Sequence, residues 1–519
     1  TYDLKDKEQI RSRRSFTLFA GLLRANSTLT QLTLSSVMPE HVDVLAEALA
    51  TNTTMKELRL EQPSKTNDTA ISTLPVQELN GQVSKQEIDL SKAGDPVPGG
   101  EGLAAFQPIH RHACSVIGAI LGANTSVQRL KLNPGSASEG GAILEHLHRA
   151  RKSSLVTLDV TGIELGDRGG SKFFETLLAG KCGFLRSLHL GHNKLTDAAV
   201  GPLIVEVLRA DGCNIATLDL NNNLISAPVV TQAIKYNRSL TNVDIRECPI
   251  DDEGFGNIGS LLLEADCPCR MAYISCMAFE VADGATELKI HGDQLGEGAT
   301  KLLAGIFKYN GLIKRVSLAG LNIQTSAASS LAIAVQHNTT LTSIDLSNNP
   351  LTDVTKYPNQ DTRETEGLSQ LADAVRVNRS LDSITLEGGK LPVDQLKGEK
   401  KVRLLDLSRK NLGFVSAIFI GTLLRSNTYI TELILHSNDL SPIGATIIVR
   451  QLSPHLKTLD IANVARLEER TKGDKKQDKK AFQRSQVADL PPEQLETLWA
   501  AVCNLGTLDK LTMDRDHLK

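Results

Sequence analysis

The feature that most constrains this chain is an apolar pattern, LxxLxL, that returns along nearly its whole length behind an asparagine. Asn-x-Ser/Thr, the acceptor for N-linked sugar, occurs seven times. Sugar attachment has no reason to keep register with the apolar pattern, whereas asparagine tolerates the left-handed conformation that ends many helices. We therefore expect these asparagines to end helices rather than to carry glycans. Six of the seven stand three residues before the first apolar residue of the pattern: Asn26, Asn52, Asn124, Asn237, Asn338 and Asn378.

Each copy of the pattern predicts a short strand with one buried edge. In LRSLHLGHNKL (185–195) the leucines point inward while Arg186 and His189 face outward, as period-two burial requires. Asn193, Asn223 and Asn349 follow their strands at matching places, where an amide can satisfy backbone groups of the turn. The intervening stretches are helix-like, and one such unit cannot bury its apolar edge alone. Stacked repeats are therefore expected.

Composition is consistent with one continuous core and narrows the range of partners. Hydrophobic residues make up 41% of the chain and aromatic residues only 4%, so aliphatic side chains carry the packing. The formal net charge of −3 gives no global attraction to nucleic acid or to an anionic membrane. No apolar run approaches the ~20 residues of a membrane-spanning helix. We expect no nucleic-acid partner and no membrane span.

The eight cysteines are scattered, and no cysteine-rich cluster marks either end of the chain. This distribution favours a reducing compartment over a disulfide-capped ectodomain. It predicts an intracellular protein, cytoplasmic or cytoskeletal. The first residues lack the pattern of a signal peptide. The chain starts at Thr1 rather than at methionine, so a targeting segment could have been removed. A location inside an organelle is therefore a second alternative.

The repeats resemble the leucine-rich repeat family, in particular the class typified by ribonuclease inhibitor and the Ran GTPase-activating protein. LTSIDLSN (341–348) and LRSLHLGHN (185–193) match the consensus of that class, and the resemblance covers about residues 16–513. It implies an α/β fold: a curved solenoid with a parallel β-sheet on the concave face and helices on the convex face. The overall arrangement resembles large protist or algal members of the family.

A second level of repetition overlies the first. LPVQELNGQVSKQEIDLS (74–91) and LPVDQLKGEKKVRLLDLS (391–408) align without a gap and share eight of eighteen residues. These stretches are too short for a full crossover helix, so we expect irregular turns that change the curvature. The expected organisation is a basic lead-in over 1–15, a solenoid over 16–461 with irregular modules near 74–90, 274–290 and 391–407, a charged insertion over 462–492 and a C-terminal cap over 493–519.

No motif predicts catalysis or a bound metal. His110, His112 and Cys114 lie close together, but no fourth ligand is evident, and zinc usually needs three or four protein ligands. The P-loop, the G-x-S-x-G elbow and H-E-x-x-H are all absent. We expect no enzyme activity, no cofactor and no metal site.

Outward strand positions carry the candidate binding residues. Aspartates at matching places could form an acidic column that recognises a basic partner, or could simply support the turns, which we favour. Basic residues interrupt the column, and such a mixed surface suits a protein partner. The aspartates are Asp89, Asp159, Asp219, Asp244, Asp345, Asp406 and Asp460. The predicted concave-face site comprises Arg129, Lys131, Arg186, His189, Asp219, Asp244, Lys314, Arg315 and Asp345.

The stretch from Val464 to Arg484 is rich in lysine and poor in apolar residues, so it cannot bury a core of its own. It is either a solvated loop or a basic docking arm for an acidic partner, and both readings stay open. The helix-like PEQLETLWAAVCNL (492–505) and the strand LDKLTM (508–513) would cap the last repeat. The candidate docking residues are Lys472, Lys475, Lys476, Lys479 and Lys480.

These observations predict a non-catalytic protein–protein interaction scaffold that binds one or more proteins as a structural or accessory subunit of a multisubunit assembly. The alternative, which the resemblance suggests, is a GTPase-activating regulator of a small GTPase, for which Arg246 or Asn221 could be the acting residue. Ribonuclease inhibition is a third reading, disfavoured because eight cysteines are few beside the cysteine-rich inhibitors.

Overall fold

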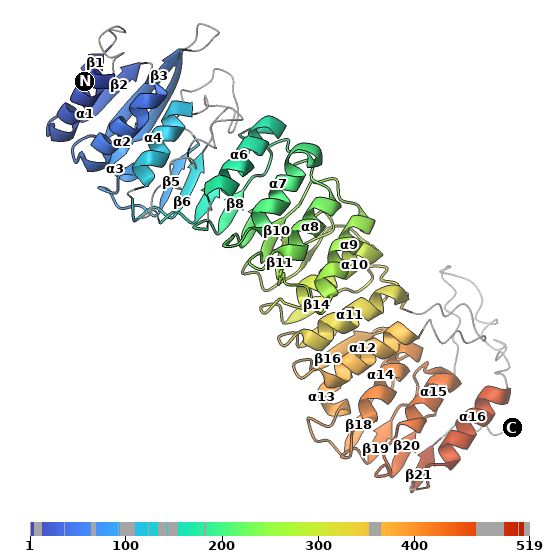
Figure 1. The fold of residues 1–519 in the computed structure, drawn as a ribbon. Helices are drawn as coiled ribbons and strands as arrows, with labels where there is room; N and C mark the ends of the chain where they lie inside the picture. The colour runs from blue at the N-terminus through green and yellow to red at the C-terminus, as the bar shows by residue number, and fades with distance from the viewer. Residues whose placement is uncertain are drawn as a thin grey trace, which may run out of the picture. The chain divides into compact units, whose positions relative to one another are not determined.

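We describe the fold from a computed structural model. It describes residues 2–4, 13–35, 37–63, 69–91, 93, 109, 111–122, 124–132, 143, 154–163, 165–180, 183–351, 365–462, 492–506 and 508–512. The chain forms two compact units, Thr1–Asp283 and Gly284–Lys519. In each unit the strands form one layer and the longer helices lie on one side of it (Figure 1).

The first unit alternates strands with helices. Its strands are β1 (Tyr2–Leu4), β2 (Gln31–Ser35), β3 (Glu57–Pro63), β4 (Thr69–Pro75), β5 (Glu87–Leu90), β6 (Arg129–Leu132), β7 (Thr157–Asp159), β8 (Ser187–His189), β9 (Thr217–Asp219), β10 (Asn242–Asp244), β11 (Tyr273–Ser275) and β12 (Phe279–Val281). Its helices are α1 (Arg13–Ala25), η1 (Pro39–His41), α2 (Val42–Thr51), α3 (Val76–Leu79), α4 (Arg111–Leu121), α6 (Gly166–Gly180), α7 (Asp197–Arg209), α8 (Ala227–Tyr236) and α9 (Asp252–Leu263).

The second unit repeats this alternation. Its strands are β13 (Lys289–Ile290), β14 (Arg315–Ser317), β15 (Ser343–Asp345), β16 (Ser383–Leu386), β17 (Gly389–Pro392), β18 (Leu404–Asp406), β19 (Glu432–Ile434), β20 (Thr458–Asp460) and β21 (Lys510–Thr512). Its helices are α10 (Glu297–Phe307), α11 (Thr325–His337), α12 (Glu366–Val377), α13 (Val393–Leu396), α14 (Phe414–Leu424), α15 (Ser441–Arg450) and α16 (Pro492–Cys503). None of the helices that the structure describes has both the length and the apolar character to cross a bilayer.

The period-two pattern sets which side of each strand is buried. Leu188, Leu218 and Val243 pair in register on β8, β9 and β10, and each is at most 3% exposed. Their strand neighbours face away from the helices, so each three-residue strand gives one side chain to the core and two to the opposite surface. The α/β solenoid class expected from the sequence is confirmed.

The asparagines of the LxxLxL pattern do end helices, but not by a left-handed cap. Asn338 follows α11 with φ −73° and ψ 136°, which is extended backbone. Its Nδ2 donates to the carbonyls of Phe307 (2.6 Å) and Asn310 (2.9 Å) in the preceding repeat, while its Oδ1 accepts from the backbone N–H groups of Thr340 and Leu341. The predicted conformation was wrong because the side chain, not a reversed backbone, satisfies the helix end.

These bonds also decide between the structural and the glycan readings of the sequons. An N-linked sugar would have to replace a hydrogen on Nδ2, the atom that donates to the neighbouring repeat. The five buried sequon asparagines are at most 4% exposed, so the fold leaves no room for a glycan. They are Asn52, Asn124, Asn237, Asn338 and Asn378.

A second set of asparagines holds the turns after the strands, as the sequence predicts. Nδ2 of Asn223 donates to the carbonyls of Leu190 and Leu220, both at 2.9 Å, and its Oδ1 accepts from the N–H groups of Asn193 and Leu195. Left-handed residues occur in these turns instead, for example Asn348 with φ 58°. Each turn is therefore bonded both to itself and to the next repeat.

The irregular modules are β-hairpins, which the sequence did not predict. β3 pairs antiparallel with β4, β16 with β17 and β11 with β12, whereas the strands of neighbouring repeats pair parallel. After β4 and β17 a single helical turn, α3 or α13, replaces the crossover helix. A sheet ends at β4 and another at β17. The expected irregularity therefore consists of one reversed strand.

Candidate binding surface

The residues that face away from the helices on β6 to β10 form a continuous charged row. Strand register places Lys131 beside Asp159, Asp159 beside His189, His189 beside Asp219 and Asp219 beside Asp244. Neighbouring strands lie about 4.8 Å apart, so adjacent side chains of the row are within reach of one another. We call these five residues the charged row.

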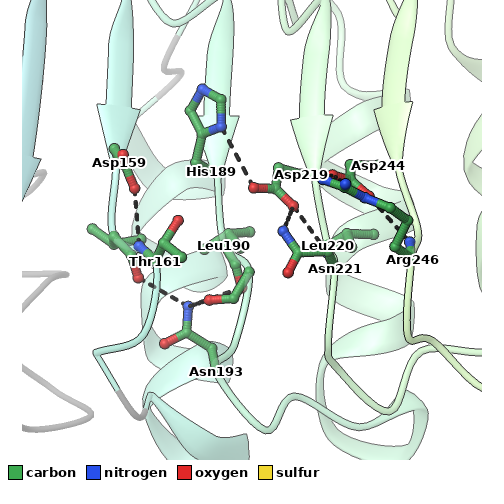
Figure 2. A network of polar contacts seen from close by, with 12 residues as sticks. Asp159, Thr161, His189, Leu190, Asn193, Asp219, Leu220, Asn221, Asp244 and Arg246 are labelled. Atoms are coloured by element: carbon green, nitrogen blue, oxygen red, sulfur yellow. Dashed lines mark hydrogen bonds and ion pairs between the residues drawn. The ribbon is translucent and has the colours of Figure 1, made fainter. Parts of the chain in front are cut away.

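One carboxylate oxygen of each aspartate in the row is used by the fold. Oδ1 of Asp219 accepts from the N–H of Asn221 at 2.9 Å, two residues further on, and Asp159 and Asp244 do the same with Thr161 and Arg246 (Figure 2). The interpretation of these aspartates as supports of the turn is confirmed. The same bond is made by Asp89, Asp345, Asp406 and Asp460.

The second oxygen of each aspartate faces a basic side chain. Arg129 Nη2 lies 3.9 Å from Asp159 Oδ2, His189 Nδ1 lies 3.6 Å from Asp219 Oδ2, and Arg246 Nη2 lies 2.6 Å from Asp244 Oδ2. The three aspartate side chains are 10–18% exposed, whereas those of Arg129 and Arg246 are 44% and 47% exposed. A partner would therefore meet guanidinium groups with carboxylates beneath them, rather than a bare acidic column.

Two ionisable groups on this surface, Asp219 of the row and Arg246 beside it, have shifted pKa values. Burial alone would raise the pKa of Asp219, but hydrogen bonds from His189 and Asn221 outweigh burial and hold this pKa below its usual value. Asp244 accepts hydrogen bonds from Nε and Nη2 of Arg246 and raises the pKa of that guanidinium. The surroundings therefore stabilise the ionised forms of Asp219 and Arg246.

The predicted concave-face residues divide between the two units. Arg129, Lys131, His189, Asp219 and Asp244 lie together on β6 to β10, and Arg186 is exposed immediately before β8. Lys314, Arg315 and Asp345 belong to β14, β15 and the residue before β14, in the second unit. The five candidate docking lysines, Lys472, Lys475, Lys476, Lys479 and Lys480, lie outside the described residues.

The two residues nominated for GTPase activation are already engaged by neighbouring side chains. Arg246 Nε lies 3.0 Å from Asp244 Oδ1 and completes a two-point contact, while Asn221 Nδ2 donates to Asp219 Oδ1 at 2.6 Å. The geometry adds no support to that alternative. The Arg246–Asp244 pair itself was missed, although the Asp-x-Arg spacing at a strand end could have indicated it.

Cysteines and histidines do not gather into a metal site in the part of the chain that the structure describes. Cys248, Cys269 and Cys276 are buried separately, and burial raises their thiol pKa values to about 11, 12 and 11. Cys248 Sγ donates to the carbonyl of Leu220 at 3.2 Å and so replaces the asparagine of its turn. These thiols act as small core residues.

Comparisons with known proteins agree with the repeats. The model of a family described as Leucine Rich repeat matches residues 181–203, 236–258 and 337–354. A human relative, NACHT, LRR and PYD domains-containing protein 14, is 23% identical over 324 residues, which cover 53% of this chain and 28% of the relative. The chain therefore spans less than a third of that relative's length.

Two solved structures are similar at low identity, and both have a TM-score of 0.27. The TLR13–ssRNA13 complex is 15% identical, with 85% of this chain and 51% of that chain covered. The yeast Rad7–Elc1 complex is 12% identical, with 69% and 73% covered. The stacked strand–helix units and the three matched stretches show that this chain contains leucine-rich repeats.

Proposed function

We propose that the chain is a non-catalytic scaffold that binds a partner protein through the charged row and the arginines beside it. The observation that carries this proposal is the row itself: polar side chains held in register on consecutive parallel strands, with Arg129 and Arg246 nearly half exposed. Because the backbone bonds of the aspartates fix the row, a partner can bind without ordering it first.

A protein partner fits this surface better than nucleic acid does. A phosphate backbone would meet a carboxylate beside each of these basic groups: Asp159 beside Arg129, Asp219 beside His189 and Asp244 beside Arg246. A folded protein surface can place both signs of charge opposite the row. We further propose that the partner belongs to a multisubunit assembly in which this chain is an accessory subunit.

The test compares two variants with equal loss of charge. One replaces Arg129, Arg186 and Arg246 with glutamine; the other replaces Arg168, Lys172 and Arg209 on α6 and α7 with glutamine. Tagged chains are purified from the native source, and stoichiometric partners are identified by mass spectrometry. We expect the first variant to lose its partner and the second to retain it. Recovery of the parent as a free monomer, or equal partner loss in both variants, would overturn the proposal.

A further inference from the structure

The two aligned modules provide an internal comparison of what the fold requires. β4–α3–β5 and β17–α13–β18 share the same sequence of elements, and Gly81 and Gly398 have φ values of 81° and 80° at matching turns. The eight residues they share include the buried Leu79 and Leu396, which the packing requires. Where the modules differ on the surface, the fold does not dictate the residue.

The largest surface difference is in charge. The second module carries Lys400, Lys401 and Arg403, all exposed, where the first carries Val83, Ser84 and Gln86. Since the same backbone forms with uncharged residues, these cations are not needed to build the turn. Because the fold does not require these cations, we look for the reason for their clustering in the binding of a partner.

A fourth cation, Lys457, joins them from two strands further along the same sheet. The N–H of Thr431 donates to the carbonyl of Arg403, and the N–H of Lys457 donates to the carbonyl of Thr431, both at 2.8 Å. These bonds place Arg403 and Lys457 two strand spacings apart, about 10 Å. Lys400, Lys401, Arg403 and Lys457 therefore form one cluster at the amino ends of β18 and β20, which we call the basic edge.

The surroundings of the basic edge combine charge with apolar surface. Lys401 Nζ lies 4.9 Å from the ring centre of Tyr429, which is 41% exposed, and Leu404 is 51% exposed. Exposed acids near it are Glu432 and Asp509, while Glu399 is held by Lys397 at 2.9 Å. Four exposed cations thus face two exposed free carboxylates, which leaves the edge positive.

A cleft continues this surface between α15 and α16. Its volume is about 890 Å³, and its lining is mixed. The apolar residues Val449, Leu452, Pro454, Ala501 and Leu505 stand beside the polar or charged residues Arg450, Glu496, Thr497 and Asn504. Pro454 immediately precedes exposed His455 and lies three residues before Lys457. The apolar part of this mixed lining lies next to the cations, and an aliphatic side chain of a partner that packed against it would be removed from water.

We infer that the basic edge docks an acidic segment of a partner protein that also carries aliphatic side chains, which rests on the proposed scaffold function. The carboxylates would meet Lys400, Lys401, Arg403 and Lys457, and an aliphatic side chain would enter the cleft. Nucleic acid fits less well, because Lys401 already lies against the Tyr429 ring on which a base would stack, and the recess is partly apolar.

The test uses residues that the chain itself provides. The edge variant combines Lys401→Ser with Arg403→Gln, the residues found at these places in the first module, so it is expected to fold. The control combines Arg209→Gln with Lys235→Ser, which removes two cations that lie 4.9 Å and 5.7 Å from the ring centre of Tyr236. The probe is a fluorescein-labelled peptide of alternating Glu and Leu, measured by fluorescence anisotropy.

We expect the parent and the control to bind the peptide equally, the edge variant to bind about tenfold more weakly, and high salt to weaken the parent. No binding by the parent, or equal binding by the edge variant, overturns the inference. Tighter, edge-dependent binding of labelled oligo-dT would reassign the edge to nucleic acid and also overturn it. The proposed scaffold function fails separately, in the comparison of glutamine variants of the strand face with the native partner.

Discussion

The carboxylate of Glu387 accepts a hydrogen bond from the backbone N–H of Gly413 at 2.7 Å, twenty-six residues further along the chain. The same carboxylate accepts from the N–H groups of Val415 and Ser416 and from the Ser416 hydroxyl. Glu387 lies in the tight turn between β16 and β17 with φ 48°, followed by Gly388 with φ 90°. One hairpin turn therefore caps the amino end of α14 in the next repeat.

Replacing Glu387 with glutamine should lower the free energy of unfolding of the second unit by about 1–2 kcal/mol, because the charge is lost at three helix N–H donors. Urea unfolding followed by circular dichroism measures this change. Glu432→Gln serves as the control, since Glu432 is exposed on β19. Equal stability of the two variants would contradict the capping role.

We call the six asparagines that stand at the helix ends, Asn26, Asn52, Asn124, Asn237, Asn338 and Asn378, the asparagine ladder. Replacing one of its buried members should lower the free energy of unfolding more than replacing the exposed Asn26. Asn338→Ala leaves the N–H groups of Thr340 and Leu341 and the carbonyls of Phe307 and Asn310 without their amide partner. We expect a loss of about 2–4 kcal/mol in the free energy of unfolding. Asn26→Ala, at an exposed position, should cost less than about 1 kcal/mol.

Equal losses for Asn26→Ala and Asn338→Ala would show that burial of the ladder contributes nothing. Mass spectrometry of the native protein checks the same geometry chemically. We expect Asn338 without glycan, because its Nδ2 is 2.6 Å from the carbonyl oxygen of Phe307 inside the fold. A glycan at Asn338 would contradict the buried ladder.

What could be predicted from the sequence depended on the range of the interaction. Leu188 and Leu190 were predicted as core because period-two burial is local, and Asp219 was predicted to support a turn because its partner is two residues away. The conformation of Asn338 was mispredicted because its Nδ2 partners lie in the preceding repeat. Such a contact between two repeats cannot be predicted from the residues that are close to Asn338 in the sequence.

The hairpins and the ion pairs were not predicted from the sequence for the same reason. Antiparallel return of β17 onto β16 depends on a turn with two positive φ values, and EGG at 387–389 is a weaker signal than Asn-Gly. The occlusion of Asp159 and Asp244 by Arg129 and Arg246 depends on side-chain conformations. The sequence therefore indicated which residues lie on the face, but not which charges it presents.

Thiol reactivity should follow burial. Cys503 is exposed, whereas Cys248, Cys269 and Cys276 are buried with pKa values raised to about 11, 12 and 11, so they are almost fully protonated at pH 8. We expect iodoacetamide to label Cys503 in the folded protein and to label these three only after denaturation. Peptide mass spectrometry over a time course measures the rates. Rapid labelling of Cys269 in the folded protein would contradict the described packing.

The charged row should make the first unit sensitive to acid through Asp219. Because His189 and Asn221 hold the folded-state pKa of Asp219 below its usual 3.8, despite the opposing effect of burial, the ionised side chain contributes to stability. That contribution is fully present above 3.8 and is lost as the pH falls through the folded-state pKa. Asparagine at this position cannot titrate, so the parent and Asp219→Asn should differ most in unfolding free energy above pH 4 and converge below it. His189→Gln should shrink the pH-dependent part of this difference, because it removes the imidazole that lies beside Asp219 Oδ2 and helps to lower the pKa of Asp219. Urea unfolding of the three proteins at a series of pH values measures both effects, and a difference between parent and Asp219→Asn that grows toward low pH would reverse the assigned direction.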